Sequence, residues 1–262
     1  MVKNFFIGLL AGVGNIMPGL SGSALLIIFK LYDKIIKAIS NIFKDFKKSF
    51  LFLLPIGLGI ILGTFIFSNL IEFSLTKAPV ITSITFVGFM MGTLPSLFTQ
   101  ATSKGFKKKY LIFFLITFTI GCLFLVLKDV VPTMNENTSF LWLILLGFIL
   151  AFTMIIPGIS GTVLLTILGM YQTYLTAIND LNLALLIPIA LGFALGIFML
   201  SKVINYFLNK FYGETFFAIL GFTIATIPGL LIYPISSFWE LLIGVVLALL
   251  AFVLTVFVTK KS

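Results

Sequence analysis

Long runs of apolar residues, separated by short polar segments, dominate this chain. The runs are roughly 18–25 residues long, enough for a helix to cross a hydrocarbon core about 30 Å thick. They lack the alternation of apolar and polar positions that a membrane β-barrel requires. The pattern therefore predicts an all-α polytopic membrane protein, with spans over residues 50–73, 80–99, 110–127, 183–208, 215–233 and 239–258.

Composition supports this class. Hydrophobic residues make up 60% of the chain and charged residues 10%, and the mean hydropathy of +1.24 lies far outside the soluble range. The net charge of +9 comes from lysines in the short loops, as membrane topology alone requires, so we expect no nucleic-acid partner. The single Cys122 suggests neither a disulfide nor a metal site, and we expect no cofactor.

Two apolar stretches are interrupted in the same way, by MPGLSG at 17–22 and IPGISG at 156–161. Residues 8–41 align with 147–180 without a gap, and the proline, both glycines and the serine of the two motifs coincide. Similarity resumes after a shift of register, between the segments that begin at Pro55 and Pro188. We interpret the chain as two copies of one unit within one membrane domain, covering residues 1–135 and 136–262.

Each copy is predicted to contain a re-entrant helical hairpin, over 5–30 and 140–178, followed by three spans. If the hairpins return to the side from which they came, nearly all lysines lie on one side, as the positive-inside rule demands. An odd number of spans per copy then makes the two copies inverted relative to each other. Both termini are expected in the cytoplasm.

The hairpin tips have a specific chemistry. Pro18 disfavours helix at Met17, and Gly19 and Gly22 permit conformations closed to other residues, so the helix should break there. A helix that restarts near Ser21 offers free backbone N–H groups and hydroxyls, which favour an anion. The alternative is that these residues only allow close helix packing.

Charged residues within or near the spans are the next candidates. Ser68 and Glu72 share one helix face, and their repeat partners are Ser201 and Asn205. Glu72 and Lys202 either reach the membrane surface or take part in ion coupling. Tyr32 and Tyr171 are interpreted as anchors at the membrane interface, although their matched positions also allow a role in a cavity.

The twin PG(L/I)SG motifs, each followed by a tyrosine at the same spacing, resemble the bacterial polyprenyl-phosphate (undecaprenyl-phosphate) transporter family, formerly a domain of unknown function. The resemblance covers nearly the whole chain. It implies a flippase in the bacterial plasma membrane that moves undecaprenyl phosphate, or a similar polyprenyl phosphate, from the outer to the inner leaflet for reuse in cell-envelope synthesis. Asn15 stands where the family usually has an acidic residue.

The resemblance, together with the break chemistry, places the substrate-binding residues at the two tips: Asn15, Pro18, Gly19, Ser21, Gly22, Ser23, Pro157, Gly158, Ser160, Gly161 and Thr162. Protons are the candidate coupling ion, with Glu72 and Lys202 as candidate coupling residues. The alternatives are a transporter of a small soluble anion and an intramembrane lipid pyrophosphate phosphatase. An enzyme is disfavoured because the chain has no His, no Arg and only scattered carboxylates for such chemistry.

Overall fold

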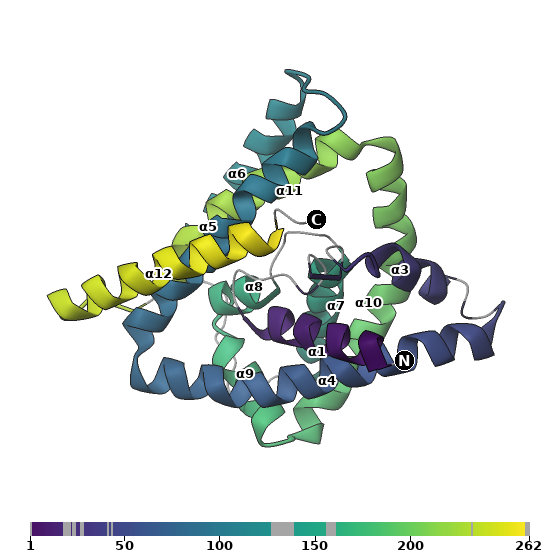
Figure 1. Ribbon diagram of the computed structural model, residues 1–262, viewed down its shortest axis with the longest axis horizontal. Coiled ribbons are helices and arrows are strands. Elements are labelled where there is room, and N and C mark those ends of the chain that lie inside the picture. The colour runs from purple at the N-terminus through teal and green to yellow at the C-terminus, as the bar shows by residue number, and fades with distance from the viewer. Residues whose placement is uncertain are drawn as a thin grey trace.

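The computed structural model consists of helices, with no strand among the residues that it describes, which are 2–17, 22, 25–26, 29–40, 42, 44–126, 139–155, 161–231 and 233–259. Five helices are long and apolar enough to cross a membrane (Figure 1). They are α4 (Phe46–Lys77), α5 (Pro79–Thr102), α10 (Leu183–Lys210), α11 (Tyr212–Thr226) extended by the 3₁₀ helix η1 (Ile227–Leu230), and α12 (Phe238–Thr259). The chain is therefore an all-helical, multi-pass membrane protein, as its sequence predicted.

The other helices are shorter. The apolar helix α6, predicted as a span, has 17 residues and is about 26 Å long. The pair α8–α9 bends by 117°, which fits a re-entrant element. The bounds of the shorter helices are α1 (Val2–Ile16), α3 (Tyr32–Ser40), α6 (Tyr110–Val126), α7 (Phe140–Ile155), α8 (Gly161–Ile167) and α9 (Tyr171–Asn179).

Most of the large apolar side chains on α4, α10 and α12 are exposed. On a soluble protein such faces would be a liability, whereas in a bilayer they contact lipid tails. The buried side chains lie mainly on α5, α8, α9 and α11, at the centre of the bundle. The distribution of exposure thus agrees with a lipid environment.

The helices pack as four pairs, and glycines set the distance of approach. In each pair, residues of increasing number on one helix contact residues of increasing number on the other, so all four pairs are parallel. The contacts are Gly8 with Ile56 and Gly12 with Ile60 in α1–α4, Gly147 with Ile189 and Gly196 with Phe148 in α7–α10, Gly88 with Ala248 and Gly92 with Phe252 in α5–α12, and Gly221 with Phe114 and Gly121 with Ala225 in α6–α11. Small residues on both partners let the backbones meet closely, as is usual for membrane helices.

The pairing follows the two copies recognised in the sequence. Helix α1 pairs with α4 inside the first copy, and α7 with α10 inside the second. The remaining pairs are exchanged, because α12 packs on α5 and α6 packs on α11 (Figure 1). Helix α6 of the first copy therefore lies against α11 of the second, and α12 of the second lies against α5 of the first, so the two copies are interlocked.

Backbone conformation repeats at the end of each hairpin. Lys30 and Gly169, which are aligned in the two copies, both have positive φ, of 56° and 67°. The amide that follows each of them bonds five residues back, from Leu31 to Leu26 (2.9 Å) and from Met170 to Leu165 (2.8 Å). This is a Schellman-type helix end, and the chain bends by 117° between α8 and α9.

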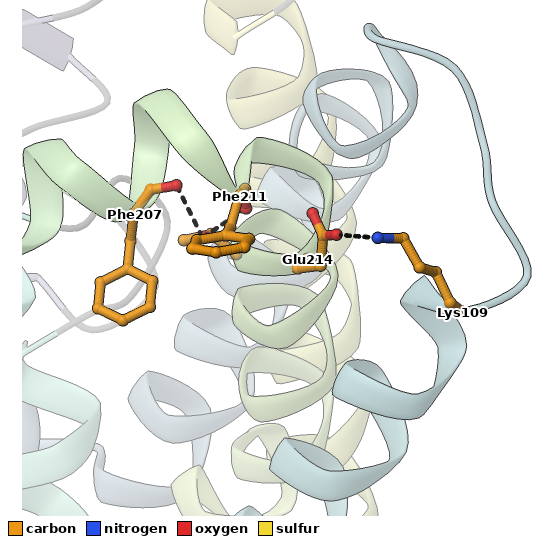
Figure 2. Close-up of polar contacts among 5 residues, drawn as sticks. Lys109, Phe207, Phe211 and Glu214 are labelled. Carbon is orange, nitrogen blue, oxygen red and sulfur yellow. Dashed lines mark hydrogen bonds and ion pairs between the residues drawn. The ribbon is translucent and has the colours of Figure 1, made fainter.

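An ion pair joins the loop before α6 to the first turn of α11. Lys109 Nζ lies 2.7 Å from Glu214 Oε1 (Figure 2). In the same region Lys104 lies over the ring of Tyr212, 4.2 Å from its centroid. The α5–α6 loop and the start of α11 are therefore at the same end of the bundle.

Candidate functional site

A cavity of about 500 Å³ lies between the two copies. Its wall comes from α1, α4, α7, α9 and α10 and from the first residue of α8. Several pairs of aligned positions both line it, including Gly22 with Gly161 and Ile60 with Phe193. Its volume falls within the usual range for a small-ligand site.

In each copy, one neutral polar side chain lies against the last glycine of the PG(L/I)SG motif. The Asn15 side-chain oxygen lies against Cα of Gly22, so that a methyl group at that glycine would overlap it. In the second copy the Thr153 hydroxyl lies against Gly161 in the same way. All four residues line the cavity. The two polar residues are not aligned with each other: Thr153 aligns with Gly14, and Asn15 with Met154.

The rest of the described wall is mostly apolar. The Thr64 and Thr153 hydroxyls donate to their neighbours Gly12 O (3.3 Å) and Leu150 O (2.9 Å), so their lone pairs remain for a ligand. Among the described lining residues there is no Lys, Asp or Glu. A ligand here would meet neutral hydrogen-bonding groups near the ends of α1 and α7 and apolar side chains elsewhere.

Two tyrosines, one from each copy, bond to the helix that precedes the PG(L/I)SG motif of the other copy. The Tyr171 hydroxyl donates to the carbonyl oxygen of Ile16, the last residue of α1 (2.6 Å). The Tyr32 hydroxyl donates to the carbonyl oxygen of Ile155, the last residue of α7. A carbonyl at the end of a helix has no partner within the helix, so each tyrosine satisfies one such group in the other copy. Tyr171 is only 5% exposed, which fits the cavity role that its matched position allowed better than an anchor at the membrane interface.

A second polar cluster joins α4 to α9. The Glu72 carboxylate accepts hydrogen bonds from Thr176 Oγ1 (3.0 Å) and from the Asn179 amide. The buried Ser68 hydroxyl donates to the Asn179 side-chain oxygen and also lies 2.8 Å from Phe65 O. Phe65, one turn before Ser68 on α4, lines the cavity. These hydrogen bonds hold the carboxylate between α4 and α9, two of the helices that line the cavity.

Of the predicted substrate-binding residues, Asn15, Gly22 and Gly161 line the cavity, and Thr162 is buried in the first turn of α8. Glu72, a predicted coupling residue, is hydrogen-bonded to Thr176 and Asn179. The side chain of Lys202 lies outside the described residues. The same holds for the predicted residues Pro18, Gly19, Ser21, Ser23, Pro157, Gly158 and Ser160.

A sequence model of the family described as "VCA0040-like: Undecaprenyl phosphate translocase-like" matches residues 1–110 and 101–241. The chain belongs to this undecaprenyl phosphate translocase-like family. One relative of this chain is a "Polyprenyl-phosphate transporter" of Staphylococcus aureus (strain NCTC 8325 / PS 47). It is 28% identical over 244 residues, which cover 87% of this chain and 86% of the relative.

A second relative carries the same name, "Polyprenyl-phosphate transporter", and comes from Vibrio cholerae serotype O1 (strain ATCC 39315 / El Tor Inaba N16961). It is 23% identical over 241 residues that cover 87% of this chain and 76% of the relative. No solved structure matches this translocase-like chain. The resemblance found in the PG(L/I)SG motifs is therefore confirmed at the level of the family.

Sequence reasoning missed two parts of the site in this family member. Thr153 was not singled out, because it aligns with a glycine and its role depends on its contact with Gly161. The contribution of α9, through Tyr174 and Ile178, was also missed. The matched tyrosines were a usable signal, but only the fold reveals that each reaches the other copy.

Proposed function

We propose that this protein is a membrane transporter of a polyprenyl phosphate. The observation that carries the proposal is the cavity between the two copies, which has neutral polar groups at both helix breaks and apolar side chains elsewhere. An amphipathic lipid with a small anionic head and an isoprenoid tail matches this division. The two relatives, both named polyprenyl-phosphate transporters, support the same substrate class.

We propose an inverted arrangement of the two halves, 1–135 and 136–262. If α1 and α4 enter from the same side, the segment between them must return to that side, and their parallel packing supports this. The parallel pairs α5–α12 and α6–α11, and the Lys109–Glu214 ion pair, fit copies of opposite orientation. In copies of like orientation these pairs would be antiparallel. With the lysine-rich loops inside, both termini face the cytoplasm of a bacterial plasma membrane.

The phosphate group would bind between the hairpin tips. Its ligands would be backbone N–H groups and hydroxyls near the ends of α1 and α7, and no cationic side chain is among the described lining residues. The isoprenoid tail would lie against Ile61, Leu186 and Phe193. The proposed substrate-binding residues are Asn15, Pro18, Gly19, Ser21, Gly22 and Ser23 of the first hairpin and Pro157, Gly158, Ser160, Gly161 and Thr162 of the second. The apolar wall favours this lipid over a small soluble anion, which would leave most of the cavity without a partner.

The proposed direction is from the outer to the inner leaflet. Moving one negative charge inward against an inside-negative potential costs about 2.3 kcal/mol per 100 mV, so net movement needs a co-transported cation or removal of the product. We propose protons as the coupling ion. Glu72, fixed beside the cavity by Thr176 and Asn179, is the first candidate carrier, and Lys202 is the second.

The test uses purified protein in liposomes that carry a trace of labelled polyprenyl phosphate, with leaflet exchange followed at several pH values. We expect protein-dependent exchange that is lost in the Ser21→Ala/Ser160→Ala double variant. Labelled phosphatidylglycerol in parallel liposomes should not move, because the site is built for one small head and an isoprenoid tail. Absence of exchange by folded, inserted wild-type protein would overturn the proposal.

A further inference from the structure

A second, smaller cavity of about 130 Å³ lies away from the first. It is lined by the end of α4, the first turns of α5, the α8–α9 turn and residues Leu230 and Tyr233. These ends of α4, α5 and η1 are opposite to the lysine-rich ends of α4 and α5. In the proposed topology the cavity is therefore at the external side of the membrane.

Ser83 distinguishes this cavity from an ordinary packing gap. Its neighbours on α5, Thr82 and Thr85, both donate their hydroxyls to carbonyls of their own helix, at Ala78 (2.8 Å) and Ile81 (2.8 Å). Ser83 is only 4% exposed. Its hydroxyl makes no hydrogen bond within the described part of the chain, and its oxygen is not fully enclosed, since no fully enclosed side-chain oxygen there lacks a partner. Since Ser83 lines the cavity, this donor is available to whatever occupies it.

Other polar groups converge on the same space. The Gln172 amide donates to the Tyr233 hydroxyl at 3.4 Å, a weak bond that a better acceptor would replace. The Thr166 hydroxyl donates to Thr162 O (2.8 Å), so it offers the cavity only lone pairs, which could accept from a protonated oxyanion. Hydroxyl and amide donors thus come from α5, α9 and residue 233, and no charged side chain is among the described lining residues.

One side chain connects the small cavity to the large one. Tyr171 lines the small cavity, and its hydroxyl donates to the carbonyl oxygen of Ile16. The neighbouring Asn15 lines the large cavity at the first helix break. Tyr171 thus borders the small cavity, while its hydroxyl is bonded to the residue that follows Asn15 of the large cavity.

We propose that the small cavity around Ser83 is a second site for a phosphate-type oxyanion, occupied before the headgroup passes Tyr171. The volume equals that of about four water molecules, which is enough for a phosphate group but not for an isoprenoid tail. Neutral donors give moderate affinity, and a site on a transport route must also release its ligand. The inference rests on the proposed function for the lipid source of the phosphate, but the oxyanion chemistry stands on Ser83, Gln172 and Tyr233.

The test measures thiol reactivity in the full-length protein with Cys122→Ser, reconstituted in nanodiscs. Ser83→Cys is nearly isosteric and places a thiol in the cavity, whereas Thr93→Cys places one at similar burial on α5 but outside it. We expect a small hydrophilic methanethiosulfonate to modify Ser83→Cys at least about tenfold faster than Thr93→Cys, because reactivity follows access. If Ser83→Cys does not fold, Thr166→Cys reports on the same cavity.

Protection then identifies the ligand. A short-chain polyprenyl phosphate at four times its Kd should slow the reaction of Ser83→Cys about fivefold, whereas the matching polyprenol should not. Protection by inorganic phosphate to the same extent would support the oxyanion site with a soluble source. Equal slow reaction of the two cysteine variants, or fast reaction without protection by any phosphate, would overturn the proposal.

Protection needs no movement of lipid across the bilayer, so it separates this inference from the proposed function. Wild-type protein that exchanges polyprenyl phosphate while Ser83→Cys stays unprotected would refute only the second site. Protected Ser83→Cys in a protein that exchanges no lipid would refute only the transport proposal.

Discussion

The Tyr171 hydroxyl donates a 2.6 Å hydrogen bond to the carbonyl oxygen of Ile16, across 155 positions of the chain. Its aligned partner Tyr32 makes the equivalent bond to Ile155 in the opposite direction. The last carbonyl of α1 and the last carbonyl of α7 thus each accept a hydrogen bond from a tyrosine of the other copy. Each copy therefore stabilises a helix end of the other.

Removing the Tyr171 hydroxyl should destabilise the protein measurably. We expect Tyr171→Phe to lower the free energy of unfolding by about 1–3 kcal/mol, because the buried carbonyl of Ile16 loses its partner. Denaturant or thermal unfolding in detergent would measure the change. Tyr206→Phe is the matched control, since the exposed Tyr206 hydroxyl accepts from the nearby Lys210 (2.9 Å), and a change within about 0.5 kcal/mol is expected. Equal effects of the two variants would refute the special role of Tyr171.

The helix pairs should not tolerate a methyl group at their glycine contacts. In Gly59→Ala the new Cβ would overlap the carbonyl oxygen of Phe5, which belongs to rigid helix backbone. We expect a loss of about 1–3 kcal/mol or more from overpacking. Gly57→Ala, two residues away on α4, has nothing within 4 Å of the new Cβ. That control should be neutral, or stabilising by up to about 1 kcal/mol through helix propensity. Similar melting temperatures for both variants would contradict the close packing.

Lys30 occupies a conformation that suits glycine. Its φ is 56°, and the aligned residue in the second copy is Gly169. We expect Lys30→Gly to stabilise the protein by about 1 kcal/mol, because a side chain with positive φ costs roughly that amount. Lys34→Gly, within α3, should instead destabilise by about 1 kcal/mol. Unfolding transitions of the two variants give opposite shifts if the turn is as described, and shifts of the same sign if it is not.

Glu72 should govern the pH dependence of exchange. We expect Glu72→Gln to fold, to lose about 1–2 kcal/mol because a glutamine cannot accept from both Thr176 and Asn179, and to make leaflet exchange less sensitive to pH. The liposome assay at several pH values measures this. Glu240→Gln is the control, as its carboxylate accepts from the neighbouring Ser236 (2.9 Å) and does not line the cavity. Unchanged exchange and unchanged pH dependence in Glu72→Gln would remove Glu72 from the coupling mechanism.

The Lys109–Glu214 pair should stabilise the loop in a pH-dependent way. The hydrogen bond to Glu214 raises the pKa of Lys109 above its usual 10.5. Its contribution is therefore fully present below pH 10.5 and is lost as the pH rises through the raised pKa. We expect a small difference in melting temperature between wild type and Glu214→Gln at pH 8, since Lys109 is 57% exposed. The difference should shrink above pH 10.5 and in high salt. A difference independent of both would assign the effect to packing.

Most of the helices could be read from the sequence. The runs at 50–73 and 183–208 were predicted as spans, and the structure has α4 and α10 there, each a few residues longer. This succeeds because apolar length alone decides whether a helix can cross a bilayer. The repeat was equally visible, since two copies of PG(L/I)SG in register with a following tyrosine need no structure to be recognised.

The sequence by itself determined the membrane class, the helices, the duplication and the family, because these depend on hydrophobic length and on local motifs. Only the tertiary structure decided which residues meet. It placed Thr153 against Gly161, brought α9 to the cavity, exchanged α6 and α12 between the copies, and directed Tyr171 to Ile16. Such contacts arise from the packing of distant segments, and no spacing along the chain encodes them.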